Sequence, residues 1–246
     1  MTEFQLNKSE KSVSIKSAIV IGATGLVGKQ LVQRLVSSGR YATVYQIVRR
    51  PPPQSNSQST IGQDTTLETI VINDFAAMQQ HLTRLNLNQA DAFSTLGTTL
   101  KQAGSKDAFR QVDLAYNLKF AQIVKKLGVQ HFLLLSATGA NARSPFFYNK
   151  IKGELEQAVE QLCFERLSIF QPSLLLGEHQ DARLAENLAQ KAFSLVKPVL
   201  SQTWKYRPIE GERVAQAMCI AGAQPTHGKV VYSNTDMLSL TLENPA

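Results

Sequence analysis

Residues 18–28 read Ala-Ile-Val-Ile-Gly-Ala-Thr-Gly-Leu-Val-Gly, an apolar run that ends in three glycines, Gly22, Gly25 and Gly28. The run predicts a strand, a tight turn and the start of a helix, because apolar side chains recur every three or four residues over 27–36. In such a unit the first glycine permits the sharp turn, the second lets backbone N–H groups approach a pyrophosphate, and the third lets the helix pack closely on the strand. The stretch therefore predicts a dinucleotide site at the N-terminus of a helix.

The second predicted strand, residues 43–48, ends in Arg49 and Arg50. In NAD sites an acidic residue about 20 residues after the glycine turn holds the ribose 2′-hydroxyl. No carboxylate stands here, and a guanidinium offers a planar, two-pronged partner for a 2′-phosphate, so the pattern favours NADP(H). The alternative is that both arginines are solvated surface charges.

Strand and helix signals alternate along the rest of the chain. Further strands are expected at 69–72, 92–96, 131–136, 166–170 and 229–233, and helices at 75–85, 109–127, 148–162, 183–200 and 209–220. This order predicts an α/β, doubly wound parallel-sheet Rossmann fold, whose ligands bind at the carboxyl ends of the strands.

Length and composition favour one domain over residues 1–246, with a polar N-terminal segment at 1–16 and a small C-terminal substrate-binding portion at about 178–246. No run of 18 or more apolar residues occurs, and the N-terminus lacks the apolar segment of a signal peptide, so a cytoplasmic protein without membrane contact is expected. Cys163 and Cys219 lack metal-ligand spacing and are expected to be buried, with no disulfide and no metal site.

The chain carries 26 Lys and Arg against 19 Asp and Glu, a formal charge of +7. The basic residues are scattered rather than gathered in a stripe or tail, which argues against a nucleic-acid partner. A positive field suits an anionic cofactor and a small-molecule substrate.

Small or polar residues follow the predicted strands. Asp74 either hydrogen-bonds the adenine amino group or caps the next helix. Gly97 would let the backbone approach the ribose or pyrophosphate. Thr98 and Thr99 either hydrogen-bond the ribose or only stabilise a turn.

Tyr148 and Lys152 lie four residues apart, so they share one face of a predicted helix. A phenol is a poor base at neutral pH, but a nearby ammonium and an oxidised nicotinamide favour the phenolate. Tyr148 would then exchange a proton with a substrate hydroxyl or carbonyl. Ser136, at the end of the fifth strand, would hold the substrate oxygen by a hydrogen bond.

With these residues assembled, the chain resembles the short-chain dehydrogenase/reductase superfamily, in the atypical branch whose nucleotide motif is Gly-x-x-Gly-x-x-Gly. The likeness spans roughly residues 17–177. Further strings look like the NADPH-binding oxidoreductase group around TIP30, the Tat-interacting protein also called CC3: Val48-Arg49-Arg50, Leu96-Gly97-Thr98-Thr99, Val112-Asp113, Leu134-Leu135-Ser136 and Tyr148-x-x-x-Lys152-Gly153-Glu154.

This resemblance implies a set of cofactor contacts and a proton-transfer set. NADP(H) would be bound at the glycine turn, at the end of the second strand and at the end of the fourth, by Thr24, Gly25, Leu26, Val27, Arg49 or Arg50, Leu96, Gly97 and Thr98. Ser136, Tyr148 and Lys152 would transfer the proton, and Pro172 matches the position where the superfamily's chain closes over the nicotinamide. Asn117 either supports a water relay to the active-site lysine or is a polar residue of a helix face.

Ser144-Pro145-Phe146-Phe147 stands where related sugar dehydratases carry an acidic pair, which disfavours elimination chemistry. Phe146 and Phe147 either form an apolar wall over the nicotinamide or pack under a loop. Two functions remain open. One is an oxidoreductase that moves a hydride between NADPH and a small, partly apolar carbonyl or alcohol. The other is an NADPH-binding regulatory or scaffold protein with little turnover. The charged helix faces leave monomer and homodimer equally open.

Overall fold

The computed structural model describes residues 16–51, 65–177 and 206–243. Its main sheet has seven parallel strands in the order β3-β2-β1-β4-β5-β6-β9. The strands are β1 (Lys16–Ile21), β2 (Tyr41–Val48), β3 (Thr66–Val71), β4 (Asp91–Ser94), β5 (His131–Leu135), β6 (Arg166–Gln171) and β9 (Gly228–Ser233). The chain winds outward in both directions from β1 and β4, and ligands of such sheets bind where the order reverses. The predicted Rossmann fold is confirmed.

The register aligns the carboxyl ends of the central strands. Ile21, the last residue of β1, pairs with Ile47 of β2 and with Ser94 of β4. The apolar residues 18–21 form the predicted strand and are completely buried, because helices cover both faces of a parallel sheet. The loops after β1, β2 and β4 therefore leave the sheet at the same edge.

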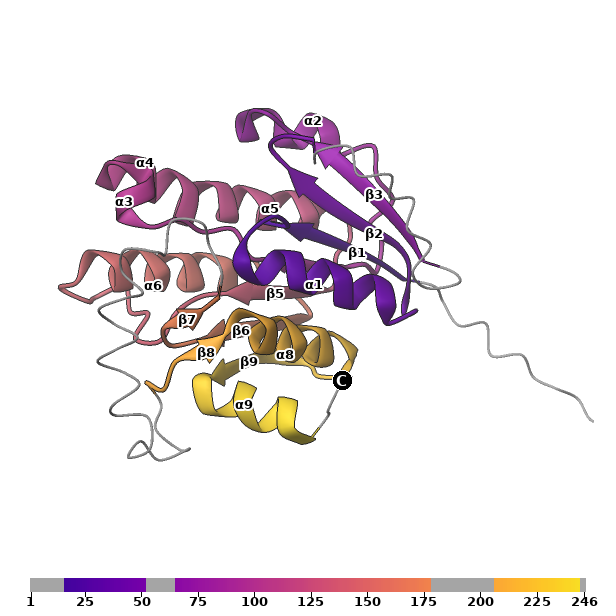
Figure 1. Ribbon diagram of the computed structural model, residues 1–246. Helices are drawn as coiled ribbons and strands as arrows, with labels where there is room; N and C mark the ends of the chain where they lie inside the picture. The colour runs from indigo at the N-terminus through magenta and orange to yellow at the C-terminus, as the bar shows by residue number, and fades with distance from the viewer. Residues whose placement is uncertain (1–15, 52–64, 178–205, 244–246) are drawn as a thin grey trace, which may run out of the picture.

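Helices cover both faces of the sheet (Figure 1). One layer contains α1 (Leu26–Ser37), α8 (Gly211–Ala223) and α9 (Asn234–Glu243), and the other contains α2 (Met78–Leu82), α5 (Asn117–Lys126) and α6 (Phe147–Glu160). Leu31 and Met218 represent the core of the first layer, and Phe120 and Leu155 that of the second; all four are completely buried. The amphipathic periodicity in the sequence thus follows from burial against one face of the sheet.

The predicted helices at 75–85 and 109–127 are interrupted. The first is the 3₁₀ turn η1 (Phe75–Ala77) followed by α2, and the second is α4 (Lys106–Arg110), the π-helical turn η2 (Gln111–Tyr116) and α5. Through the π turn the buried positions are Phe109, Asp113, Asn117 and Phe120, two of which are polar, so the period of apolar residues did not reveal it.

The C-terminal portion also differs from prediction. Ile209–Glu210 form strand β8, which pairs in parallel with β7 (Leu175–Leu176), and helix α8 begins only at Gly211. Two-residue strands are too short to carry a period. The helix expected at 183–200 lies outside the described residues.

Cys163 was predicted to be buried and is exposed; it lies in the turn after α6, past the apolar period of the helix, with a φ of 50°. Cys219 is buried, as predicted. Within the described ranges no helix is long and apolar enough to cross a membrane, and no cluster of three or more potential metal ligands occurs.

Candidate functional site

The glycine turn lies against the end of β4. Gly22 has a φ of +79°, and a Cβ there would lie 2.5 Å from the amide nitrogen of Leu96. A Cβ on Gly28 would lie 2.1 Å from the carbonyl oxygen of Gly22. Only glycine fits these two positions, because larger residues would push apart the turn, the helix and β4.

The turn offers backbone N–H groups to a ligand. Gly25 is the N-cap of α1 and supplies no capping side chain, so the first N–H groups of the helix are not satisfied by one. Val27 is buried, whereas the side chain of Thr24 is exposed. The side chain of Leu26 packs under Gly177 and Gly211, where added Cβ atoms would lie 2.2 and 2.8 Å from it. This cradle of small residues and free N–H groups fits a pyrophosphate.

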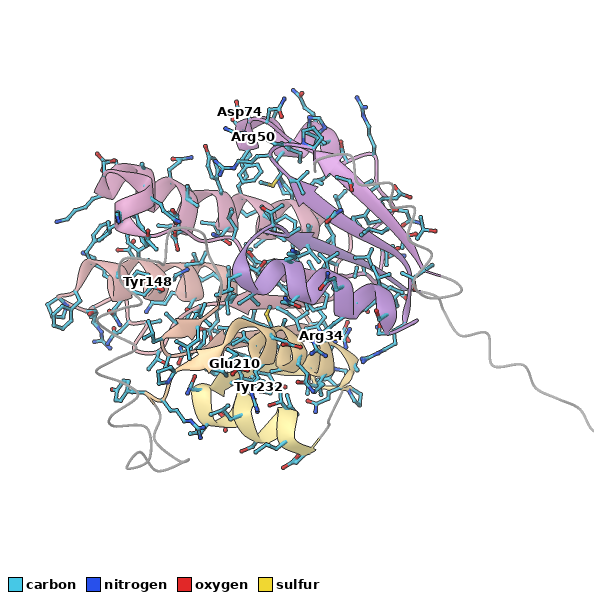
Figure 2. The ribbon with its side chains drawn as sticks, in the orientation of Figure 1. Arg34, Arg50, Asp74, Tyr148, Glu210 and Tyr232 are labelled. Carbon is cyan, nitrogen blue, oxygen red and sulfur yellow. The ribbon has the colours of Figure 1, made fainter. Side chains whose placement is uncertain are left out.

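Arg50 and Asp74 lie together beyond the carboxyl ends of β2 and β3 (Figure 2). Arg49 and Arg50 are exposed and form no ion pair with the described residues. Asp74 Oδ1 accepts a hydrogen bond from the backbone N–H of Ala76 at 2.8 Å, which is the capping alternative. A contact between Asp74 and adenine remains a prediction.

The loop after β4 rests on a buried ion pair. Lys152 Nζ lies 2.7 Å from Asp113 Oδ1, and the two side chains are 6% and 1% exposed. The other oxygen, Asp113 Oδ2, accepts the backbone N–H of Thr98 at 2.8 Å. A Cβ on Gly97 would lie 3.3 Å from Asp113 Oδ1, so Gly97 passes directly over the pair. The hydroxyl of Thr99 caps α3 (Leu100–Ala103), in agreement with the turn-forming alternative.

Sequence reasoning missed the role of Asp113, which it recorded only as part of a string similar to a known group. Asp113 lies in η2, between Phe109 and Asn117, and all three are buried. The signal was present in the sequence. An acidic residue at four-residue spacing within an apolar helix face must pair with a cation when it is buried.

Asn117 is not a polar residue of an exposed helix face, and its part in a water relay stays a prediction. It is buried, with its Oδ1 accepting the hydroxyl of Ser94 at 2.5 Å. Its Nδ2 donates to the carbonyl oxygens of Leu96 and Val112, at 3.2 and 2.9 Å. Both amide hydrogens are therefore used to tie the end of β4 to the π-helical turn.

Tyr148 stands at the start of α6, well away from Arg50 and Asp74 in the view of Figure 2. Its side chain is exposed, its ring centroid lies 5.8 Å from that of Phe109, and Lys152 Nζ lies 6.0 Å from its ring centroid. The tyrosine and the lysine thus share one helix face, as their spacing predicted. Phe147 packs on Phe109 with centroids 5.7 Å apart, while Phe146 is 72% exposed.

Ser136 is buried at the end of β5, and its hydroxyl donates to Glu156, which lies two turns beyond Tyr148 on α6. Gln171 Nε2 donates to both oxygens of the same carboxylate, at 3.0 and 3.1 Å. Burial raises the pKa of Glu156 above its ordinary value, against the hydrogen bonds and two lysines that lower it. Pro172, just past β6, is buried and accepts the N–H of Thr138 at 2.9 Å. The described residues thus bring Ser136 to Glu156; sequence reasoning missed this partner.

Comparisons with known proteins find a matching family model and named relatives. A model of the NAD(P)H-binding family matches residues 22–162. The chain is 34% identical over 210 residues to the mitochondrial protein FMP52 of Debaryomyces hansenii, over 85% of this chain and 88% of that one. It is 36% identical over 179 residues to protein HTATIP2 of Rattus norvegicus, which is TIP30, over 72% and 70% of the two chains.

Two solved structures show the same fold. MoeE5 in complex with UDP-glucose and NAD has a TM-score of 0.63 at 14% identity, and covers 93% of this chain and 82% of its own. The protein gox2181 has a TM-score of 0.65 at 13% identity, with coverages of 91% and 96%.

The expectation of a cytoplasmic protein is wrong against these comparisons, because several FMP52 relatives are named as mitochondrial. That expectation rested on the lack of an apolar signal segment. Mitochondrial transit segments are amphipathic and need no such segment, so its absence carried no information on this compartment.

Proposed function

The chain belongs to the NAD(P)H-binding family, and on that premise we propose that it is an NADP(H)-dependent oxidoreductase of the short-chain dehydrogenase/reductase type. It would move a hydride between NADPH and a small carbonyl or alcohol, with Tyr148 as the acid and base. The observation that carries the proposal is the pairing of an exposed phenol with a buried, fixed ammonium on one face of α6, at the same sheet edge as the glycine cradle.

The cofactor would lie across the switch point of the sheet. The N–H groups of Leu26 to Gly28 and the hydroxyl of Thr24 would hold the pyrophosphate, while the N–H of Gly25 donates to the carbonyl oxygen of Gly22 at 3.0 Å. At one end Arg49 or Arg50 would pair with the 2′-phosphate, with Asp74 near the adenine. At the other end the backbone of Leu96 to Thr98 would approach the ribose, and Pro172 the nicotinamide. When bound, this group supplies or accepts the hydride.

Tyr148 would give a proton to the substrate oxygen during reduction and take it back during oxidation. The ammonium of Lys152 lies 6.0 Å from the ring centroid of Tyr148 and is paired with the carboxylate of Asp113. Asp113 would keep Lys152 in place beneath the phenol. Ser136 would hold the substrate oxygen, and Phe146, which is largely exposed, would provide an apolar wall.

We assign residues from about 178 to 246 to the substrate side of one domain. Leu26 of the glycine turn packs against Gly177 and Gly211, one on each side of the undescribed part of this portion. The cofactor turn is therefore in direct contact with described residues on both sides of 178–205. A C-terminal portion of this size suits a small substrate. The protein would act as a monomer or as a homodimer.

One observation favours the second function, an NADPH-binding regulatory protein. The positive charge of Lys152 is paired with the negative charge of Asp113, and the Ser136 hydroxyl already donates to Glu156. Both contacts reduce the groups free to act on a substrate, so slow turnover would be consistent with a binding role.

Titration of the purified protein with NADPH, followed by cofactor fluorescence and then by NADPH consumption on aldehydes, ketones and quinones, tests the proposal. We expect binding with turnover, and Tyr148→Phe should abolish turnover while leaving NADPH affinity nearly unchanged. Tyr45→Phe, on strand β2, is the matched control and should keep full activity. Binding without turnover on any compound would favour the regulatory role, and an equal rate in Tyr148→Phe would exclude the mechanism.

We also propose a mitochondrial location, supported by the names of the FMP52 relatives. Protection of the full chain from added protease in intact, isolated mitochondria is the expected result. Recovery of all the protein in the cytosolic fraction would contradict it.

A further inference from the structure

The hydroxyl of Ser136 has one proton, and Ser136 already donates it in a hydrogen bond to the carboxylate of Glu156. Ser136 is 5% exposed, and Glu156 lies on the face of α6 that also carries Tyr148 and Lys152, at steps of four residues. An ionised carboxylate can only accept hydrogen bonds, so Ser136 must donate to it. In that state Ser136 offers a substrate only the lone pairs of its oxygen.

Protonation of Glu156 would reverse this arrangement. A protonated carboxyl group carries an O–H that can donate to Ser136 Oγ. The proton of Ser136 is then free to be donated to another acceptor. A carbonyl oxygen needs such a donor, whereas the hydroxyl of a bound alcohol, before its proton passes to Tyr148, can donate to the lone pairs that the first arrangement leaves.

We propose that Glu156 is a positioning residue that sets the direction of the Ser136 hydrogen bond, so that Ser136 offers the substrate oxygen either a proton or a lone pair. This inference rests on the proposed function and deepens it. It names the group that adapts the site to a carbonyl or to an alcohol.

The surroundings of Glu156 allow both states. Burial opposes the charged form, while the amide of Gln171 and the ammonium groups of Lys152 and Lys229 favour it. Lys229 is itself bound to Glu160 at 2.7 Å, which divides its charge between two carboxylates. The result is a carboxyl group whose pKa is raised above the ordinary glutamate value.

Solvent protons can reach this carboxyl group. Glu156 lines a cavity of about 270 Å³ on the side of α6, between the loop after β5 and strand β9. The wall is formed by Ala140, Asn141, Ala142, Gly153, Gln157, Glu160 and Lys229. Glu156 thus connects a buried hydroxyl on one side with a polar cavity on the other.

The first experiment needs neither substrate nor turnover. Infrared difference spectra of the full chain, recorded as the pH is raised, should show a protonated carboxyl band that disappears above the range of an ordinary glutamate. Glu156→Gln should remove the band, and Ser136→Ala should shift it because its hydrogen-bond partner is lost. Glu160→Gln, one turn along the same helix, should leave it in place. A band that is absent, or that Ser136→Ala does not move, would overturn the inference.

The second experiment uses 9,10-phenanthrenequinone as the carbonyl probe with NADPH. In the wild type and in Glu160→Gln, kcat should fall by up to about tenfold per pH unit above the Glu156 pKa, as the donor state is lost. In Glu156→Gln this dependence should vanish, because the side chain no longer ionises. An unchanged profile in Glu156→Gln would overturn the inference. If the wild type binds NADPH but reduces no probe, the proposed function fails, and the infrared result alone decides the role of Glu156.

Discussion

Replacement of Asp113 with Asn should show how strongly the ion pair under the candidate site holds the fold. The Lys152 and Asp113 side chains are almost completely buried, with charged atoms 2.7 Å apart. At an effective dielectric constant of about 20, the Coulomb attraction over this distance is roughly 6 kcal/mol, most of which offsets the loss of hydration. Removal of one partner leaves the other charge buried and costs about 3–5 kcal/mol. We expect Asp113→Asn to lower the free energy of unfolding by that amount.

The loss belongs to the ion pair with Lys152 rather than to the bond with Thr98, because the single amide oxygen of an asparagine can still accept the N–H of Thr98, whereas its NH2 group cannot accept from Lys152. Urea denaturation followed by circular dichroism measures the free energy of unfolding. The double variant Asp113→Asn/Lys152→Gln contains no buried charge, and it should be more stable than Asp113→Asn alone.

Glu154→Gln is the matched control. It breaks the Arg110–Glu154 pair, which also measures 2.7 Å but has side chains 51% and 24% exposed. A pair open to solvent contributes about 0–1 kcal/mol. If Asp113→Asn costs no more than Glu154→Gln, or if the double variant is no more stable than Asp113→Asn, the reasoning about the buried pair is refuted.

Three further predictions concern the cofactor and the core. Replacement of both Arg49 and Arg50 with Ala should weaken NADPH binding about 10- to 100-fold, because a charge-assisted hydrogen bond contributes about 1.5–3 kcal/mol. In the same fluorescence titration, NADH binding should barely change. Equal losses for both cofactors would refute the 2′-phosphate contact. Burial, with the charges of neighbouring basic groups, lowers the pKa of His131 to about 3, whereas an unfolded histidine has a pKa of about 6.5. The neutral form of His131 therefore contributes its full stability above about pH 6.5, and this stability is lost as the pH falls toward 3. Between about pH 7.5 and about pH 5, urea unfolding should therefore show a loss of about 2 kcal/mol that disappears in His131→Gln and persists in His227→Gln, whose side chain is 79% exposed. Gly28→Ala places a Cβ 2.1 Å from a carbonyl oxygen, so it should lower the free energy of unfolding by about 1–3 kcal/mol, measured by thermal or urea denaturation, and abolish NADPH binding. A variant that binds NADPH normally would show that the turn adapts.

The parts of the fold and site that could be predicted are those encoded over short distances in the chain. The three glycines, the arginines after the second strand and the Tyr148–Lys152 spacing each lie within a single turn or helix. The helices were found because burial on one face imposes a period of about 3.6 residues, and the central strands because burial on both faces gives short continuous apolar runs. Elements without a period were missed, such as η2 and the two-residue strands β7 and β8.

The sequence by itself determined the doubly wound sheet, the dinucleotide turn and the helix face shared by Tyr148 and Lys152, because each depends on neighbouring residues and on hydrophobic periodicity. Only the tertiary structure decided which polar and charged groups pair with one another inside the site. Asp113 reaches Lys152, and Ser136 meets Glu156, across packed helices and strand ends. The physical reason is that a buried charge or hydroxyl must find a partner wherever the fold places one, and no local pattern records that choice.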